Sequence, residues 1–215
     1  MHISALTSLC ENPSRREARR QSRREAILDV AQRSFMEHGY AATTMSAIAA
    51  ELGGSKGTLW SYFPAKDVLF AAVLDRATEI FQHQLTLILN PQDELEPTLL
   101  RFARGFMERV TAPEALALYR LVMAEANRFP ETGRIFHERA PGRTQAALAA
   151  YLALVSARGL LCIDDPQLAA QQLIALCMAG CHRMLMIRLI DIATPEQLEA
   201  DALAAVAMFQ RAYRA

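Results

Sequence analysis

The stretch from Thr43 to Lys66, TTMSAIAAELGGSKGTLWSYFPAK, limits the possible folds of this chain more than any other segment. It predicts two short helices, over residues 45–52 and 56–62, separated by a glycine turn. Such a pair is a helix-turn-helix, whose second helix can lie in the major groove of DNA. Four apolar positions, one small position at the helix crossing and one turn glycine fit this motif in register: Ile48, Leu52, Leu59, Tyr62, Ala49 and Gly53.

The rest of the chain is typical of an all-α protein. Apolar residues make up 52% of the 215 positions, good helix formers dominate, and no strand-like alternation or internal repeat occurs. A first helix follows a capping-box spacing at Ser22 and Glu25 and ends at Gly39. Breaks at proline, glycine and capping residues predict further helices over 66–90, 97–110, 113–127, 131–139, 142–158, 165–191 and 195–213. We therefore expect about nine helices.

The net charge of zero hides an asymmetry along the chain. Residues 1–66 carry nine Lys and Arg against six Asp and Glu, whereas residues 67–215 carry 14 against 17. The positive part holds the predicted helix-turn-helix, as contact with a polyanion requires. Ahead of the motif, six arginines recur with a four-residue spacing: Arg15, Arg16, Arg19, Arg20, Arg23 and Arg24. Two interpretations remain open, a solvated charged tail and an arm that contacts phosphates or the minor groove.

The cysteines suggest a protein of a reducing compartment. Cys10, Cys162, Cys177 and Cys181 form neither a disulfide framework nor a paired CxxC motif, so we expect a cytoplasmic protein. Cys177, Cys181 and the adjacent His182 read CxxxCH on one predicted helix. Two buried packing cysteines are the simplest interpretation, and a thiol-based redox response is the alternative. We predict no metal site.

Other classes of protein find little support in the sequence. The apolar run over residues 173–192 is interrupted by His182, Arg183 and Arg188, which indicates a buried amphipathic helix and no membrane span. The first ten residues lack the basic region of a signal peptide. No GxSxG elbow, P-loop, Rossmann glycine pattern or HExxH motif occurs, so we expect no enzyme and no cofactor.

Residues 22–70 resemble the TetR family of bacterial transcriptional regulators. The residues that carry the resemblance are Ala31, Phe35, Gly39, Tyr40, Thr43, Thr44, Ile48, Ala49, Gly53, Ser55, Lys56, Gly57, Leu59, Tyr62, Phe63, Lys66 and Leu69. The segment from Tyr119 to Arg143 is similar to the AefR-type C-terminal domain of that family. The resemblance implies a flexible basic arm over 1–21, a helix-turn-helix domain over 22–66, and a ligand-binding and dimerisation domain over 67–215.

If the family geometry holds, residues 56–62 enter the major groove of an operator. The expected DNA contacts are Thr43, Thr44, Ser55, Lys56, Gly57, Thr58, Trp60, Tyr62 and Lys66. Lys56 and Thr58 can meet base edges, while Trp60 and Tyr62 can donate to phosphates and fix the register. The two threonines begin the first helix of the motif, and Lys66 can clamp the DNA backbone.

The resemblance also implies a homodimer and a ligand cavity. Small residues over 142–158 and 165–191 make these segments the expected dimer interface. The expected cavity lining is Phe102, Phe106, Met107, Tyr119, Met123, Phe136, His137, Tyr151 and Met178. We expect a sequence-specific regulator, a repressor that binds a pseudo-palindromic operator and is released by a small apolar or amphipathic ligand. The alternative is a thiol-responsive regulator that uses Cys177 and Cys181 with the same DNA-binding head.

Overall fold

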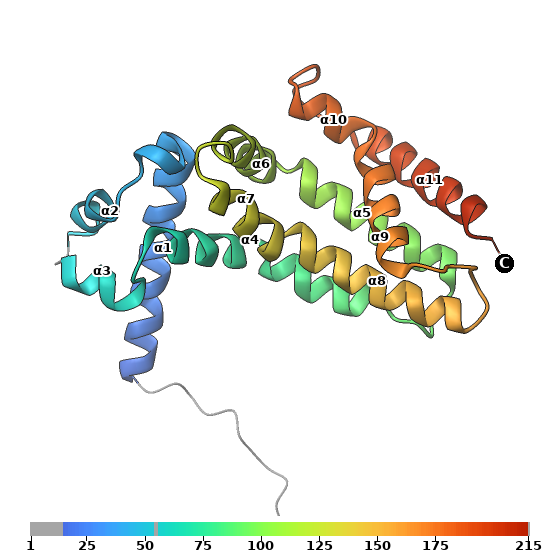
Figure 1. The fold of residues 1–215 in the computed structure, drawn as a ribbon, viewed down its shortest axis with the longest axis horizontal. Helices are drawn as coiled ribbons and strands as arrows, with labels where there is room; N and C mark the ends of the chain where they lie inside the picture. Colours follow the sequence, from blue (N-terminus) through green and yellow to red (C-terminus); the bar gives the residue numbers. More distant parts are fainter. Residues whose placement is uncertain (1–14, 54–55, 215) are drawn as a thin grey trace, which may run out of the picture.

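The computed structural model describes residues 15–53 and 56–214, and this part of the chain contains helices and no β-strand. The N-terminal head consists of α1 (Arg15–Ala42), α2 (Met45–Glu51) and α3 (Lys56–Tyr62). The remaining helices are α4 (Lys66–Ile88), α5 (Leu95–Thr111), α6 (Pro113–Glu125), α7 (Pro130–Arg139), α8 (Pro141–Ala157), α9 (Pro166–Met178), α10 (Cys181–Met186) and α11 (Pro195–Ala212). Figure 1 shows the head at one end and α4 leading from it into a helical bundle. The prediction of an all-α protein with this organisation is confirmed.

Local sequence signals account for where most helices begin. Proline opens α6, α7, α8, α9 and α11, where its missing N–H has no partner to lose. Asp165 caps α9 by accepting from the backbone N–H groups of Gln167 and Leu168 at 2.9 and 3.1 Å. Thr194 and Gln197 form a complete capping box on α11. These helices start within two residues of their predicted positions.

Two boundaries differ from prediction. Helix α1 begins at Arg15, so residues 15–21, expected in a flexible arm, are helical; residues 1–14 lie outside the described part. The single helix expected over 165–191 is wrong, because α9 ends at Met178 and α10 begins at Cys181. Asp201 of α11 explains the break: its Oδ2 accepts from the Cys181 N–H at 2.8 Å. A Cβ on Gly180 would lie 2.1 Å from that oxygen, so only glycine admits the carboxylate.

The buried side chains form two cores, one inside the bundle and one that joins the head to α6 and α7. The bundle core draws on α4, α5, α8, α9 and α11 and includes Phe102, Leu148 and Phe209. The head core includes Phe35, Leu59 and Phe70, but also takes in Leu118, Val122 and Ile135 from the bundle helices α6 and α7. The head is therefore packed directly on these two helices.

An aromatic cluster strengthens this contact between head and bundle. Tyr40 of α1 meets Phe70 of α4 and Phe129 at the start of α7, with ring centroids 5.2 and 5.4 Å apart. Phe35 adds a T-shaped contact to Phe70 at 5.1 Å. Edge-to-face pairs of this kind each contribute roughly 0.5–1.5 kcal/mol beyond simple burial. These ring contacts join α1 to α4 and to the start of α7. Among the described helices, none is long and apolar enough to cross a membrane.

Candidate functional site

The helix-turn-helix has the internal packing that its sequence predicts. Ile48, Ala49 and Leu59 are buried, and Leu52 and Tyr62 pack partly against the same core. Gly53 has φ of 62°, a conformation that few other residues adopt, and turns the chain after α2. The two helices of the motif are thereby held at a fixed angle.

The exposed face of α3 is small, polar and aromatic. Gly57 and Ser61 are exposed, Trp60 is 38% exposed, and Thr58 and Tyr62 are half-buried. Such a face suits close approach to bases and phosphates. Trp60 is accessible, as contact with DNA requires. Ser61 is exposed on the same helix, although the sequence analysis does not name it among the expected DNA contacts. Ser55 and the side chain of Lys56 lie outside the described residues.

The arginine run borders this face. Arg15, Arg16, Arg19 and Arg20 are exposed on the first turns of α1. A groove on the surface is lined by Arg20 and Arg24 of α1 together with Tyr62 of α3. The Arg24 guanidinium also stands 5.6 Å from the centroid of the Phe63 ring. The first turns of α1 and the end of α3 therefore form one continuous surface, and Figure 1 shows α1 extending past α3.

The two threonines at the start of α2 lie in different surroundings. Thr43 is 1% exposed, and its hydroxyl donates to the carbonyls of Gly39 and Ser34 at 2.7 and 3.0 Å. Its side chain therefore ties α1 to α2 and has no free face for a phosphate. Thr44 is exposed, and its hydroxyl caps α2 by accepting from the Ala47 N–H at 3.1 Å.

Lys66 is likewise turned inward and does not extend from the surface as a DNA clamp would. Its Nζ donates to the Tyr40 carbonyl at 2.8 Å and lies 4.2 Å from the centroid of the Tyr40 ring. Burial lowers the pKa of Lys66, an effect that the carboxylates of Glu125 and Glu131 oppose. Burial also raises the pKa of Tyr40 to about 12. Lys66 thus fastens the start of α4 to the end of α1.

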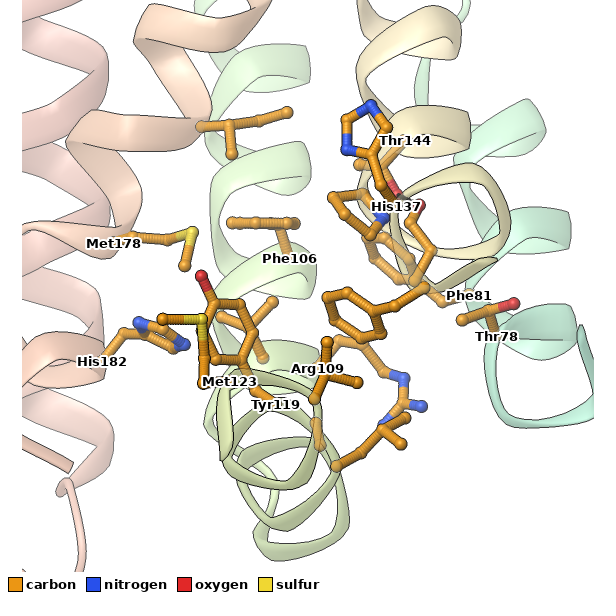
Figure 2. A pocket seen from close by; sticks show the side chains of 18 of the residues that line it. Thr78, Phe81, Phe106, Arg109, Tyr119, Met123, His137, Thr144, Met178 and His182 are labelled. Atoms are coloured by element: carbon orange, nitrogen blue, oxygen red, sulfur yellow. Dashed lines mark hydrogen bonds between the residues drawn. The ribbon is translucent and has the colours of Figure 1, made fainter. Parts of the chain in front are cut away.

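A cavity of about 450 Å³ lies among α4, α5, α6, α7, α8, α9 and α10, within the size range of small-molecule sites. Figure 2 shows Tyr119, Met123, Met178 and His182 on one side and Thr78, Phe81, His137 and Thr144 on the other. Six predicted lining residues contribute to its wall: Phe106, Tyr119, Met123, Phe136, His137 and Met178. The other three, Phe102, Met107 and Tyr151, do not line this cavity and pack inside the bundle core.

Sequence reasoning missed most of the polar groups at the cavity. They are Thr78, Gln82, Arg109, Thr144 and His182. Arg109 donates to the backbone carbonyl of Ala77, and Gln82 donates to the Thr144 hydroxyl at 3.1 Å. His182 is 5% exposed and meets the Tyr119 ring edge-to-face at 5.8 Å. A single histidine beside a cysteine carries no spacing signal, so only the folded chain reveals its position.

Helix α6 belongs to both the cavity and the head. Leu118 and Val122 line the cavity and are also members of the head core. On the same helix, Glu125 Oε1 accepts from the backbone N–H of Ala41 at 3.2 Å, at the corner where α1 turns toward α2. Packing and a hydrogen bond therefore both join α6 to the head.

The cysteines give no support to a thiol-based sensor. Cys177 and Cys181 are buried, and burial raises their pKa values to about 12 and about 11. Reactive cysteines have lowered pKa values and accessible sulfur atoms. The two residues also lie on separate helices, so the expected shared face of one helix is wrong. No group of residues suited to hold a metal ion occurs in the described ranges.

A helix-turn-helix head fused to a helical bundle with an internal cavity defines a class of DNA-binding regulators. Residues 27–73 match the model of the bacterial regulatory proteins of the tetR family, and residues 97–215 match the AefR-like transcriptional repressor C-terminal domain. The chain belongs to the TetR family and is a DNA-binding transcriptional regulator with a C-terminal domain of the AefR type.

Individual relatives agree with this assignment. The crystal structure of a TetR-family regulator from Mesorhizobium loti MAFF303099 is 29% identical, with a TM-score of 0.77 over 91% of this chain and 98% of that one. The Flavonoid-responsive Regulator FrrA is 31% identical, with a TM-score of 0.76 over 91% of this chain and 100% of that one. The transcriptional repressor ComR of Escherichia coli (strain K12) is 41% identical over 58 residues, which are 27% of this chain and 28% of ComR.

Proposed function

We propose that this protein is a dimeric transcriptional repressor that binds a pseudo-palindromic operator and is released by a small apolar or amphipathic ligand. The observation that carries the proposal is the exposed face of α3, which lies beside the exposed arginines at the start of α1. A polar face that reads bases and a cationic flank that contacts phosphates are the two parts a sequence-specific DNA reader needs. The repressor ComR, to which the chain is similar over 58 residues, supports repression as the direction of control.

Within the head, each DNA contact has a distinct proposed role. Gly57 permits close approach of the backbone, and Thr58 with Lys56 meets base edges in the major groove. Trp60 and Tyr62 donate to phosphates, and the N-terminal turn of α2 at Thr44 offers backbone N–H groups to the same strand. The arginines of α1 add phosphate contacts along the flank of the site.

The proposed dimer uses the outer faces of the last helices. The sequence predicts an interface over 142–158 and 165–191, whereas the exposed apolar side chains of α11 favour an interface that includes this helix. Leu168 of α9 is 47% exposed, Leu154 of α8 is 53% exposed, and Leu203 and Met208 of α11 are 45% and 58% exposed. We infer that α9 and α11 form the interface, because α11 contributes two large apolar side chains and a small face of Ala200, Ala204 and Ala207.

Matched charge insertions distinguish the two interfaces. Leu203→Glu on α11 is expected to give monomers in light scattering at micromolar concentration, because an unpaired carboxylate would be buried between the protomers. Leu154→Glu on α8 is expected to remain dimeric, and it serves as the matched control. The opposite pattern would return the interface to α8 and α9.

Release by ligand rests on α6. A ligand in the cavity would press on Leu118 and Val122, which also pack in the head core, and would bias the dimer toward a spacing that no longer fits two half-sites. FrrA, which is described as flavonoid-responsive, supports a ligand-dependent regulator by its similarity over nearly the whole chain.

The experiment that tests the proposal is selection of genomic DNA fragments on the purified protein, followed by footprinting of the enriched fragments. We expect two protected half-sites related by a two-fold axis and centred about one helical turn, or about 34 Å, apart. Protection without symmetry, or enrichment of random fragments, would contradict a dimeric operator reader.

A further inference from the structure

His182 is a buried polar residue of the described chain without a hydrogen bond; the buried Tyr151 hydroxyl also has no partner, but of the two only His182 lines the cavity. Besides tyrosine, seven polar side chains are buried in the described chain: Ser34, Thr43, Thr78, Thr98, Thr132, Thr144 and His182. The hydroxyl groups of the first six all take part in hydrogen bonds. Within the described residues the His182 imidazole makes a ring contact with Tyr119 but no hydrogen bond. Buried polar groups without a partner are uncommon, and each calls for an explanation.

The position of His182 supplies that explanation. The imidazole is 5% exposed and lines the cavity, next to Tyr119, Met123 and Met178 in Figure 2. Burial lowers its pKa, so the ring is neutral near pH 7 and has one nitrogen that donates and one that accepts a hydrogen bond. A ligand inside the cavity would meet the accepting ring nitrogen without displacing a hydrogen bond to another described residue.

The other walls restrict what that ligand can be. Phe81, Phe106, Tyr119 and Phe136 present aromatic surface, which suits a flat aromatic molecule. The described residues that line the cavity include no Asp or Glu, and the cationic group there, Arg109, pairs with no carboxylate of the described chain. A cationic ligand would therefore be buried without a counter-ion and near a like charge.

We propose that the cavity binds a neutral aromatic molecule bearing a phenolic hydroxyl, and that His182 is the specificity residue that accepts a hydrogen bond from this hydroxyl. The inference rests on the proposed function of the cavity as the effector site and adds the chemical class of the effector. A hydrogen bond to such a ligand also explains why histidine occupies position 182, where Phe or Leu would pack without leaving a ring nitrogen unpaired.

Three naphthalene probes of similar shape test the inference by isothermal titration calorimetry at pH 7.5. They are 2-naphthol, 2-methylnaphthalene and 2-naphthylmethylammonium. The full-length protein is expected to bind 2-naphthol about tenfold more tightly than 2-methylnaphthalene, the gain from one hydrogen bond in a buried site. The ammonium probe is expected to bind at least about tenfold more weakly than 2-naphthol, because no carboxylate compensates its charge.

Two variants assign the preference to His182. His182→Phe and His182→Leu are expected to remove the preference for 2-naphthol while leaving the affinity for 2-methylnaphthalene within about twofold, a result that also verifies an intact cavity. His83→Phe is the matched control, because His83 is exposed on α4 and does not line the cavity. This control should keep the wild-type preference.

The outcomes separate the inference from the proposed function. If 2-naphthol keeps its advantage in both His182 variants, or if the ammonium probe binds as tightly as 2-naphthol, the inference is overturned and the effector cavity stands. If both neutral probes bind the wild-type protein equally, the role of His182 is likewise overturned. If no probe binds and none weakens the complex with DNA, the inference falls together with the effector role of this cavity.

Discussion

Lys66→Met replaces the ammonium group that joins α4 to α1 by an apolar group of similar length. The change removes the hydrogen bond from Nζ to the Tyr40 carbonyl at 2.8 Å and the cation–π contact with the Tyr40 ring at 4.2 Å. A hydrogen bond to a charged group contributes about 1.5–3 kcal/mol and an exposed cation–π pair about 0.5–1 kcal/mol. Partial burial of the charge offsets some of this gain, so we expect the free energy of unfolding to fall by about 1–2 kcal/mol. For a chain of this size, Tm would fall by about 2–8 °C.

Two assays separate this internal role from a contact with DNA. Urea unfolding measures the loss of stability, and fluorescence anisotropy of the operator complex across a salt series measures the number of phosphate contacts. Each lost phosphate contact should flatten the slope of log K against log salt by about 0.9. We expect lower stability with an unchanged slope. Unchanged stability with a slope flattened by about 0.9 would refute the internal role of Lys66.

Three further substitutions test the roles of Thr43, of the arginines on α1 and of His182. Thr43→Val removes the hydroxyl that donates to the carbonyls of Gly39 and Ser34, while the Thr43 backbone N–H still donates to Gly39. The free energy of unfolding in urea titrations should fall by about 0.5–1.5 kcal/mol without a change in the salt slope of DNA binding. A flattened slope would contradict the buried role. The double variant Arg16→Ala and Arg20→Ala should flatten the salt slope of DNA binding by up to about 1.8. Its stability should stay unchanged, since both side chains are exposed. An unchanged slope would mean that the two arginines are solvated and do not contact DNA. Burial lowers the pKa of His182, so below about pH 6.5 this histidine is protonated in the unfolded chain before it is protonated in the folded one, and the free energy of unfolding falls as the pH is lowered. The His182→Phe variant should therefore lose less stability than the wild type between about pH 7 and pH 5.5. Equal losses in the two proteins would contradict this prediction.

The sequence predicts the head well because its signals are local. The spacing of Ile48, Ala49 and Leu59 matches a motif whose helices pack on each other, and Gly53 occupies a turn that favours glycine. Proline and capping residues likewise mark the helix starts. Local spacing does not, however, give the direction of a long side chain. Lys66 was expected on the DNA for this reason, although its ammonium group lies against Tyr40.

The cavity is harder to predict because distant helices decide which side chains face it. Phe102 and Phe106 lie one turn apart on α5 and have the same chemistry, yet only Phe106 lines the cavity. The break between α9 and α10 also depends on a partner far along the chain, since Asp201 of α11 occupies the space beside Gly180. That break ends the helix before His182, which packs against Tyr119 of α6.

The most direct test of the central claim is fluorescence anisotropy of the protein on the DNA upstream of its own gene, compared with scrambled DNA across a salt series. We expect saturable binding by two protomers per site, at least about 10³-fold tighter than binding to scrambled DNA, with a salt slope that corresponds to several phosphate contacts. The fragments enriched from genomic DNA would serve in the same assay if the operator lies elsewhere. Equal affinity for enriched and scrambled DNA would contradict the central claim that α3 reads a specific sequence.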